Sequence, residues 1–318
     1  MKPVAKLPVK IILLPMLNKI MKISLVKAAF LIHFTFFVLF AEMAYSQFNS
    51  NNDAVQDTLS KLSSVIWKQK TDSARFAANE IFFTKLQTLL EPKSSVLLTL
   101  DSIKGITLAI SDDKKMRIFS WNIPVSDGTN KYFGFIQFNS DSIILVPLKS
   151  GQIQNGNLSQ SQLSPQMWYG AIYYKIIQVQ FTGKQAYTLL GWDGYNQSSN
   201  RKIIDVLSLS DNGKFVFGLP VFKTDAGIKS RVVFEYAEKA NMLMRYDYQS
   251  IRVQKRKKVV KENAWLIVLD HLIPMDPSMK GMRNYYVPAG DMYDGFVFKN
   301  GYWVLVEDIE VANKPANK

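Results

Sequence analysis

Apolar residues follow two different periods along this chain, and the change from one to the other falls near Pro92. On the amino-terminal side they recur every three or four residues, which is the spacing of one face of an α-helix. The first helical series consists of Val55, Leu59, Leu62, Val65 and Ile66. The second consists of Phe76, Phe83, Leu86 and Leu90. Residues 47–92 are therefore predicted to form a helical hairpin that packs on its own domain, with a partner helix or a membrane surface as the alternatives.

The ends of these two helices carry capping signals. Asp53 precedes the first series and is the expected N-cap, because its carboxylate can accept a hydrogen bond from an amide of the first turn. Asp72 or Ser73 is expected to fill the same role in the second helix. Pro92 ends that helix, because the residue before a proline is disfavoured in the helical conformation.

Beyond Pro92 the apolar residues alternate with polar ones, which is the period of a β-strand. Strands are predicted at Ser95–Leu100, Thr107–Ser111, Met116–Asn122, Lys131–Phe138, Ser142–Leu148, Ile172–Phe181 and Ala186–Trp192. Further strands are predicted at Lys202–Ser210, Phe215–Gly218, Arg231–Tyr236, Met242–Tyr248, Trp265–Asp270, Phe296–Lys299 and Tyr302–Glu307. Residues 93–318 are therefore expected to form an antiparallel β domain.

Turn signals indicate that many of these strands pair with their neighbours in the sequence. Asn300-Gly301 lies between FVFK and YWVLVED and is the dipeptide that favours a two-residue type I′ hairpin. The DNG motif at Asp211 and the DG motif at Asp193 mark two further turns. The polar stretch at 152–166 is a predicted loop that can divide the β domain. No segment repeats at a fixed period, which favours a barrel or a sandwich-like assembly over a propeller.

The first 46 residues contain the parts of a secretory signal peptide. From Met21, a basic start is followed by an apolar run at 28–40 and by two small residues, Ala44 and Ser46. Small residues at these positions fit signal peptidase, so cleavage is predicted between Ser46 and Gln47, with export to the periplasm, the outer envelope or the medium. An uncleaved membrane anchor is the alternative, but about 13 apolar residues fall short of the roughly 20 that span a bilayer.

The segment before Met21 is basic and apolar, but prolines at positions 3, 8 and 15 interrupt it. Because prolines oppose a continuous spanning helix, this segment is not expected to cross a membrane. Met21 is the expected true start of the protein, and a long leader is the alternative.

The formal net charge is +13, and the leader contributes about +5 of it through six lysines and one glutamate. Much of the remainder lies within Ser250–Asn263, in the cations Arg252, Lys255, Arg256, Lys257, Lys258 and Lys261. This basic segment can attract polyanions or anionic lipid, although a solvated hairpin tip is the favoured interpretation. Aromatic residues are not regularly interleaved with these cations, so nucleic acid is not an expected partner.

The residue types leave few routes to catalysis. The chain has no cysteine, which excludes disulfides, thiolate nucleophiles and metal sites with cysteine ligands. His271 is the single histidine after Ser46, and there is no HExxH, GxSxG, GxGxxG or GxxxxGK[ST] motif. Neighbouring side chains of a strand point to opposite faces, so Asp270 is not expected to pair with His271. His271 is predicted to be structural unless the fold brings a distant Ser or Asp against it, and no catalytic residue, metal or cofactor is predicted.

Three other kinds of site remain open. Carboxylate pairs of the glycosidase type have no fixed spacing, and the candidates at strand ends and turns are Asp193, Asp205, Asp247, Asp270, Asp291 and Asp294. Calcium could bind the loop GWDGYNQSSN through Asp193, Asn196, Ser198 and Ser199, although ordinary turn chemistry explains these residues better. Stacking on sugars or packing in the core, with packing favoured, can explain Trp168, Tyr169, Tyr173, Tyr174, Trp192 and Tyr195.

Five segments together resemble a family of exported bacterial proteins of unknown function. They are IFSWN at 118–122, LLGWDGYNQSSNRKIIDVL at 189–207, VVFEYAEKANMLMRYD at 232–247, VLDHLIP at 268–274 and YDGFVFKNGYWVLVEDIEV at 293–311. The resemblance covers most of the chain after the leader and implies export, but it implies no ligand, activity or site residue. This chain departs from that family by a longer, more basic hairpin at Ser250–Asn263.

These features predict a mainly β protein with an N-terminal α-helical hairpin and a large antiparallel sheet assembly. The expected function is a non-enzymatic binding or structural role in the cell envelope, with envelope polymers or glycans as partners. A membrane is an expected partner only through an uncleaved leader. The alternative is a carboxylate-dependent hydrolase of envelope or extracellular glycans. A third possibility is an interaction module whose basic segment docks on anionic envelope polymers.

Overall fold

The computed structural model describes residues 33–36, 53–98, 100, 103–151, 158–181, 186–210, 212–255 and 258–310. The predicted cleavage site at Ala44, Ser46 and Gln47 lies outside these ranges, as do Arg256 and Lys257 of the basic segment. The chain divides into two units, Met1–Asp57 and Thr58–Lys318, and every strand that the structure describes belongs to the second. None of the helices in these described ranges is long and apolar enough to span a membrane.

Helix α2 spans Asp72–Leu90, and its cap differs from the predicted one. The N-cap is Thr71, whose Oγ1 accepts a hydrogen bond from the Ala74 amide at 3.3 Å. The predicted caps Asp72 and Ser73 are therefore wrong, because both residues already lie in the first turn. Asp72 instead uses its carboxylate for a contact outside the helix.

Residues 58–68 of the same unit are also helical. Leu59 and Ile66 of the predicted apolar stripe are buried, whereas Val65 is exposed. The Ser63 hydroxyl donates a hydrogen bond to the Lys104 carbonyl at 2.6 Å, which attaches this helix to the segment that precedes the first strand.

A short 3-10 helix, η1 (Lys93–Leu97), replaces the strand that was predicted at Ser95–Leu100. The prediction is wrong because the polar groups of this segment have partners other than a neighbouring strand. The Ser95 hydroxyl donates to the Leu90 carbonyl at 2.9 Å, and the Ser95 carbonyl accepts from Arg117 Nη1 at 2.9 Å. A buried arginine and a helix end thus satisfy groups that a β-ladder would otherwise use.

The strands form three sheets, which we call the first, middle and third sheets. The first sheet has the order β1 (Thr107–Ile110), β2 (Met116–Pro124), β3 (Asn130–Asn139), β4 (Ile143–Lys149). The middle sheet has the order β11 (Val232–Ala237), β7 (Ser199–Leu209), β6 (Ala186–Asp193), β5 (Ile172–Gln178), and β7 also pairs with β8 (Phe215–Phe217). The third sheet has the order β10 (Gly227–Lys229), β9 (Phe222–Thr224), β15 (Tyr302–Val306), β14 (Tyr286–Lys299), β13 (Lys258–Pro274), β12 (Met244–Lys255). Three more 3-10 helices lie in the connections: η2 (Pro165–Met167), η3 (Pro277–Met279) and η4 (Arg283–Tyr285).

The mainly β, antiparallel character predicted from the alternation of apolar residues is confirmed. The pairing of β9 with β15 is parallel, and the short strands β9 and β10 were not predicted. The type I′ hairpin is confirmed by positive φ angles of 49° at Asn300 and 77° at Gly301, between the paired strands β14 and β15. The barrel alternative is wrong, because the described strands form open sheets.

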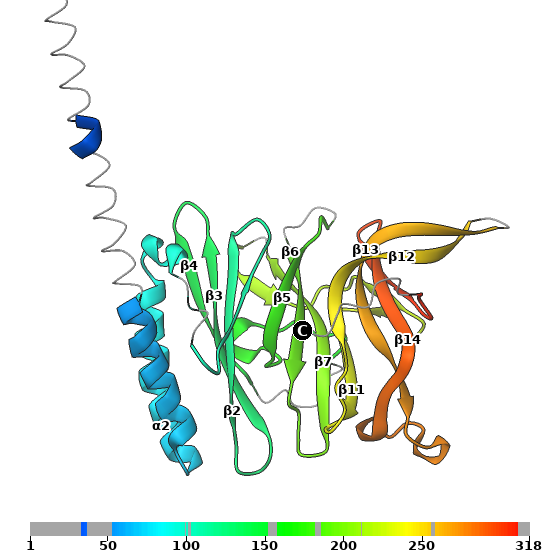
Figure 1. Ribbon diagram of the computed structural model, residues 1–318, viewed down its shortest axis with the longest axis horizontal. Helices are drawn as coiled ribbons and strands as arrows, with labels where there is room; N and C mark the ends of the chain where they lie inside the picture. The colour runs from blue at the N-terminus through cyan, green and yellow to red at the C-terminus, as the bar shows by residue number, and fades with distance from the viewer. Residues whose placement is uncertain are drawn as a thin grey trace, which may run out of the picture. The chain divides into compact units, whose positions relative to one another are not determined.

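The middle sheet is covered on both faces, as Figure 1 shows. One buried cluster joins it to the first sheet and contains Leu189 of β6 and Ile203 of β7. The next residues along these strands, Leu190 and Ile204, belong to a second cluster that joins the middle sheet to the third. Since successive side chains of a strand point to opposite faces, β6 and β7 need apolar residues at neighbouring positions.

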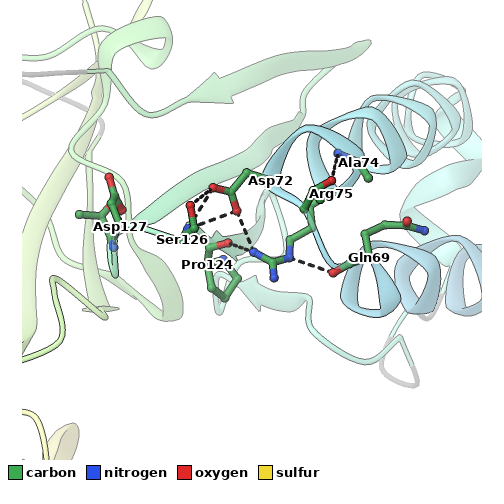
Figure 2. Close-up of polar contacts among 9 residues, drawn as sticks. Gln69, Asp72, Ala74, Arg75, Pro124, Ser126 and Asp127 are labelled. Atoms are coloured by element: carbon green, nitrogen blue, oxygen red, sulfur yellow. Dashed lines mark hydrogen bonds and ion pairs between the residues drawn. The ribbon is translucent and has the colours of Figure 1, made fainter.

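Helix α2 covers the outer face of the first sheet (Figure 1). Phe82 packs edge-on against Trp121 with ring centroids 5.3 Å apart, and Phe83 lies 4.4 Å from the Phe135 ring. Figure 2 shows the polar anchor at the start of the helix, where the Asp72 carboxylate accepts hydrogen bonds from the amide and hydroxyl of Ser126. The helix is thus attached to the β2–β3 turn.

Candidate functional site

A cavity of about 650 Å³ lies where β11, the edge strand of the middle sheet, meets β13 and β14 of the third sheet. Consecutive residues of β11 and of β13 line it, and the β9–β10 turn and η4 contribute to its wall. The titratable residues of the lining are Lys229, Arg201, Arg283, Asp225, Glu235, Asp270, Asp294, Tyr169 and His271. A cavity of this size is large enough for a small ligand, and its wall combines apolar residues with many polar ones.

Two neighbouring strands bring His271 and Asp294 together in this cavity. Asp294 lies opposite Leu269 in the β13–β14 register, and His271 follows Leu269 by two residues, next to a bulge in the ladder. His271 Nδ1 lies 2.8 Å from Asp294 Oδ2. The other oxygen of Asp294 accepts a hydrogen bond from the Asp308 amide at 3.2 Å, which holds the carboxylate in place. The sequence left this outcome open, and the fold supplies the distant aspartate.

The contact with Asp294 determines which nitrogen of His271 is available to a ligand. Because Nδ1 contacts Asp294, Nε2 is the ring nitrogen that remains for a ligand. The His271 side chain is 32% exposed and the Asp294 side chain 13% exposed. The pair is therefore half-buried, with its imidazole accessible from the cavity.

Asp270 lies next to His271 in the sequence but has a different partner, as strand geometry predicts. Its Oδ2 accepts a hydrogen bond from the Leu243 amide at 2.7 Å. Burial raises the pKa of the Asp270 carboxyl, while the Leu243 amide and the positive charges of Arg245 and Lys202 oppose that rise. Asp270 thus contributes to the cavity wall and to the attachment of the β11–β12 connection, and it does not form an acid–base pair with the histidine.

On the middle sheet, an ion pair faces the same cavity. Arg201 and Glu235 are register partners on β7 and β11. Arg201 donates from Nε and Nη2 to Glu235 Oε2 at 3.0 and 2.8 Å, and Ser199 Oγ donates to Glu235 Oε1 at 2.7 Å. Burial alone would lower the pKa of the Arg201 guanidinium, but Tyr169 and Glu235 raise it above its ordinary value. Both oxygens of Glu235 therefore act as acceptors from protein groups.

Tyr169 links this ion pair to a buried aspartate. Its hydroxyl accepts from Arg201 Nη1 at 3.2 Å and donates to Asp193 Oδ2 at 3.1 Å. The other oxygen of Asp193 accepts from Tyr132 Oη at 2.7 Å. Burial raises the pKa of the Asp193 carboxyl, and the two tyrosine hydroxyls oppose the rise. The network fixes the side chains behind the cavity wall.

These contacts bear directly on the calcium hypothesis for the loop that begins at Asp193. Asp193 bonds to two tyrosines, and Asn196 Oδ1 accepts from the amides of Ser198 and Ser199 at 2.7 and 2.9 Å. In the described part of the chain, no three histidine or acidic side chains are grouped so that they could hold a metal ion. The contacts of Asn196 are those of an ordinary turn.

The aromatic residues considered for sugar stacking do not form one platform. Trp168 and Tyr173 are fully buried in the cluster between the first and middle sheets, as the packing interpretation predicts. Tyr195 is 39% exposed, but its ring lies under the Arg201 guanidinium at 3.1 Å. Two exposed aromatic side chains, Tyr248 and Trp265, lie elsewhere, and the sequence did not single them out as site residues.

The candidates of the basic segment lie far along the β12–β13 hairpin. Arg252 is the register partner of Lys261, and Lys255 is the partner of Lys258. Lys261 is exposed. Of the side chains of this segment that the structure describes, Lys261 does not line the cavity.

Sequence reasoning did not single out Arg201, Glu235 or Arg283. Arg201 and Glu235 carry opposite charges and lie opposite each other in the β7–β11 register. Their opposite charges were the only available signal, and it could be used only if the pairing of these two strands had been predicted. Arg283 lies in η4, a connection with no local motif.

No family model, no curated protein and no solved structure matches this chain.

Proposed function

We propose that this chain is an exported, non-enzymatic binding protein of the cell envelope, and that the cavity between β11 and β13–β14 holds a small polar ligand with an anionic group. The observation that carries the proposal is the composition of the cavity wall. Arg283 and Lys229 line it, and within the described residues neither cation forms an ion pair. Asp225 also lines the cavity and lies exposed in the β9–β10 turn.

The other groups of the wall suit recognition of hydroxyls beside that anionic group. His271 presents Nε2, while the half-buried Arg201–Glu235 pair provides a polar surface that is already neutralised. Arg283 is positioned by Tyr286, whose ring lies 4.5 Å from the guanidinium carbon. A sugar acid or a sugar phosphate combines the required hydroxyls with the required charge.

The hydrogen bonds of Glu235 and Asp294 favour binding over catalysis at these two residues. A hydrolase of the glycosidase type needs one carboxylic acid that donates a proton and one free carboxylate. Glu235 accepts hydrogen bonds at both oxygens, and so does Asp294. Neither is held as a proton donor toward the cavity.

Calorimetric titration of the mature protein with a hexuronic acid, a hexose phosphate and the neutral hexose tests the proposal. The charged sugars are expected to bind and the neutral sugar to bind at least tenfold more weakly. Arg283→Ala is expected to weaken binding of the charged sugars by about tenfold or more, since it removes a charge-assisted hydrogen bond. Lys280→Ala is the matched control, because Lys280 is an exposed cation nearby that does not line the cavity. Equal effects of the two substitutions, or no binding of either charged sugar, would contradict the proposal.

A carboxylate-dependent hydrolase of glycans is the second candidate, because Asp225, Glu235 and Asp294 line one cavity. Incubation with envelope glycans, followed by assay of new reducing ends, tests it. Activity that disappears in both Glu235→Gln and Asp294→Asn would favour the hydrolase. Binding without release of reducing ends would favour the binding protein.

Export is proposed from the signal-peptide pattern before Gln47. Fractionation of cells and sequencing of the mature amino terminus test it. A protein that begins at Gln47 in the soluble envelope fraction or the medium is the expected result. A full-length chain in the membrane fraction would instead indicate an uncleaved anchor.

We further infer that residues 47–92 form the helical hairpin that their sequence predicts, and that the sheets beyond it form a sandwich-like stack. Two observations support the hairpin: helical residues at 58–68 precede α2, and Arg75 Nε donates to the Gln69 carbonyl between them at 3.2 Å. The two clusters on opposite faces of the middle sheet support the stack. Deletion of residues 47–68 is expected to lower the melting temperature, and an unchanged value would contradict the hairpin.

A further inference from the structure

The β12–β13 hairpin extends beyond the sheet to which it belongs. β13 pairs with β14 only from Leu266 onward, so residues 258–265 have β12 as their partner. Figure 1 shows these two strands reaching past the other strands of the third sheet. We call residues 248–255 and 258–265 the arm.

The base of the arm presents two large aromatic side chains to solvent. Tyr248 and Trp265 are direct register partners, with side chains 50% and 55% exposed. The Trp265 ring stacks on Tyr246 at a centroid distance of 5.1 Å and lies 5.7 Å from the Tyr248 ring. Exposure of this much apolar surface to water is unfavourable.

The position of Trp265 is fixed from below by the protein core. Tyr246 packs edge-on against Trp303 with ring centroids 6.3 Å apart. Trp303 is fully buried, and its Nε1 donates to Thr188 Oγ1 of the middle sheet at 2.8 Å. One face of the Trp265 ring is therefore held against Tyr246. Such a supported ring is suited to stacking against a flat ligand.

Polar and then cationic positions follow the aromatic pair toward the tip. The register places Ser250 opposite Asn263 and then Arg252 opposite Lys261. Successive pairs on one face of a strand are roughly 7 Å apart, so the three pairs span about 14 Å. Lys261 is exposed, and its contact with the Glu310 carboxylate at 3.5 Å joins two side chains that are 68% and 52% exposed. A contact of that kind is weak in water.

The charge of the arm is unbalanced. Residues 248–255 and 258–265 contain four cations, Arg252, Lys255, Lys258 and Lys261, and one acidic residue, Glu262. A segment of this composition attracts polyanions.

We propose that the arm binds an acidic polysaccharide. A sugar ring stacks on Trp265 and Tyr248, hydroxyls bond to Ser250 and Asn263, and carboxylate, sulfate or phosphate groups lie against the cationic positions beyond. An aromatic face, an uncharged polar pair and a cationic end match a polymer that alternates ring faces, hydroxyls and charges. The site is separate from the cavity and does not depend on what the cavity binds.

The same features favour this ligand over two other polyanions. Binding to a membrane surface requires a continuous apolar face. In the arm, Ser250 and Asn263 separate the aromatic pair from the cationic positions. Binding of single-stranded nucleic acid requires aromatic rings in series, on which successive bases stack. The aromatic residues of the arm lie together at one end of it.

The test uses the mature protein, with polygalacturonate as the acidic probe and dextran as the neutral one, in affinity electrophoresis and calorimetry. Polygalacturonate is expected to bind and dextran to bind at least tenfold more weakly. Trp265→Ala is expected to weaken polygalacturonate binding by about tenfold. Trp67→Ala is the matched control, because Trp67 is a 43% exposed tryptophan remote from the arm in sequence, and it is expected to bind like the parent protein.

Charge is tested by a second pair of variants. Arg252→Ala with Lys261→Ala is expected to weaken binding and to reduce its dependence on salt, whereas Trp265→Ala is expected to leave the salt dependence unchanged. Trp265→Phe keeps an aromatic ring and is expected to recover most of the affinity, which separates loss of stacking from a folding defect. Arg283→Ala in the cavity is expected to leave polygalacturonate binding intact. The proposal for the arm can therefore be contradicted without contradicting the proposal for the cavity.

Several results would overturn the proposal. Binding of dextran as tightly as polygalacturonate would remove the role of charge. Binding that is unaffected by Trp265→Ala would remove the role of stacking. Tighter binding of anionic phospholipid vesicles or of oligothymidylate, with the same sensitivity to the arm variants, would assign the arm to a membrane or to nucleic acid.

Discussion

The middle sheet and the arm are both built from antiparallel strand pairs, but they differ in the solvent exposure of their apolar side chains. In the middle sheet, Leu189 and Leu190 are neighbours in the sequence and both are fully buried, because each faces a different apolar cluster. In the arm, Tyr248 and Trp265 face each other across the ladder and remain about half exposed. The first arrangement stabilises the fold, whereas the second leaves apolar surface for a partner to cover.

This difference shows what the alternation of apolar residues can reveal. A strand that is covered on both faces is apolar at successive positions, as in the AYTLLGW segment of β6. A strand that is covered on one face alternates, as in residues 261–265 of β13, where exposed Lys261, Asn263 and Trp265 are separated by less exposed positions. The number of covered faces, rather than the strand itself, sets the pattern.

The strongest expected consequence of burial in the middle sheet concerns an ion pair. Arg231 Nε lies 2.6 Å from Asp205 Oδ2, and both side chains are fully buried. Asp205→Ala leaves the guanidinium buried without its carboxylate, so the free energy of unfolding is expected to fall by about 3–5 kcal/mol. Urea denaturation followed by tryptophan fluorescence measures this loss.

An exposed pair provides the control for that substitution. Lys175 and Asp112 lie 3.2 Å apart, with side chains 36% and 66% exposed. Asp112→Ala is expected to change the free energy of unfolding by no more than about 1 kcal/mol. If the two alanine variants were equally stable, burial would not distinguish the middle sheet from the protein surface.

A smaller loss is expected from an apolar truncation in the same sheet. Leu190 is fully buried in the cluster that joins the middle and third sheets. Leu190→Ala is expected to lower the free energy of unfolding by about 2–5 kcal/mol, because it removes buried surface and leaves a cavity. Leu97→Ala, at a 62% exposed leucine, is the matched control and is expected to change it by less than about 0.5 kcal/mol. Similar losses in both variants, measured in urea, would show that Leu190 is not packed as described.

Local signals predicted the strands and one turn well. The strand segments β2, β3 and β6 and the Asn-Gly hairpin between β14 and β15 depend on neighbouring residues, and the structure confirms them. The alternating run at Ser95–Leu100 failed for a long-range reason, since Arg117 of β2 bonds to the carbonyls of Ser95 and Leu98. Tertiary contacts overrode local preference at that point.

The candidate cavity was less predictable than the strands. His271 and Asp294 are 23 residues apart, and Arg201 and Glu235 are 34 apart. Each pair forms only because a particular register places its members across a ladder. A single sequence contains the residues but not the register. The sequence could therefore say only that His271 is structural unless the fold brings a distant Ser or Asp against it.

The smallest effect is expected at an exposed anchor, where water weakens each contact as it does along the arm. Asp72 of α2 accepts from the Ser126 hydroxyl at 2.5 Å and from the Ser126 amide at 3.0 Å, and it lies 2.9 Å from Arg75. The hydrogen bonds from Ser126, followed in weight by the charge of Arg75, hold the pKa of the Asp72 carboxyl below its ordinary value. A carboxyl with a lowered pKa in the folded state binds its proton more readily when the chain is unfolded.

The stability contributed by Asp72 is therefore complete above about pH 4 and is lost as the pH falls through the lowered pKa. Asp72→Asn is expected to lower the melting temperature slightly at pH 7 and to make it less sensitive to acid between about pH 4 and pH 2. Asp141→Asn, at an exposed aspartate outside the anchor, is expected to keep the acid sensitivity of the parent protein. Calorimetric melting across this pH range distinguishes the two. An Asp72→Asn profile parallel to that of the parent would mean that the contact with Ser126 does not hold α2 in solution, and that the helix depends on its apolar face alone.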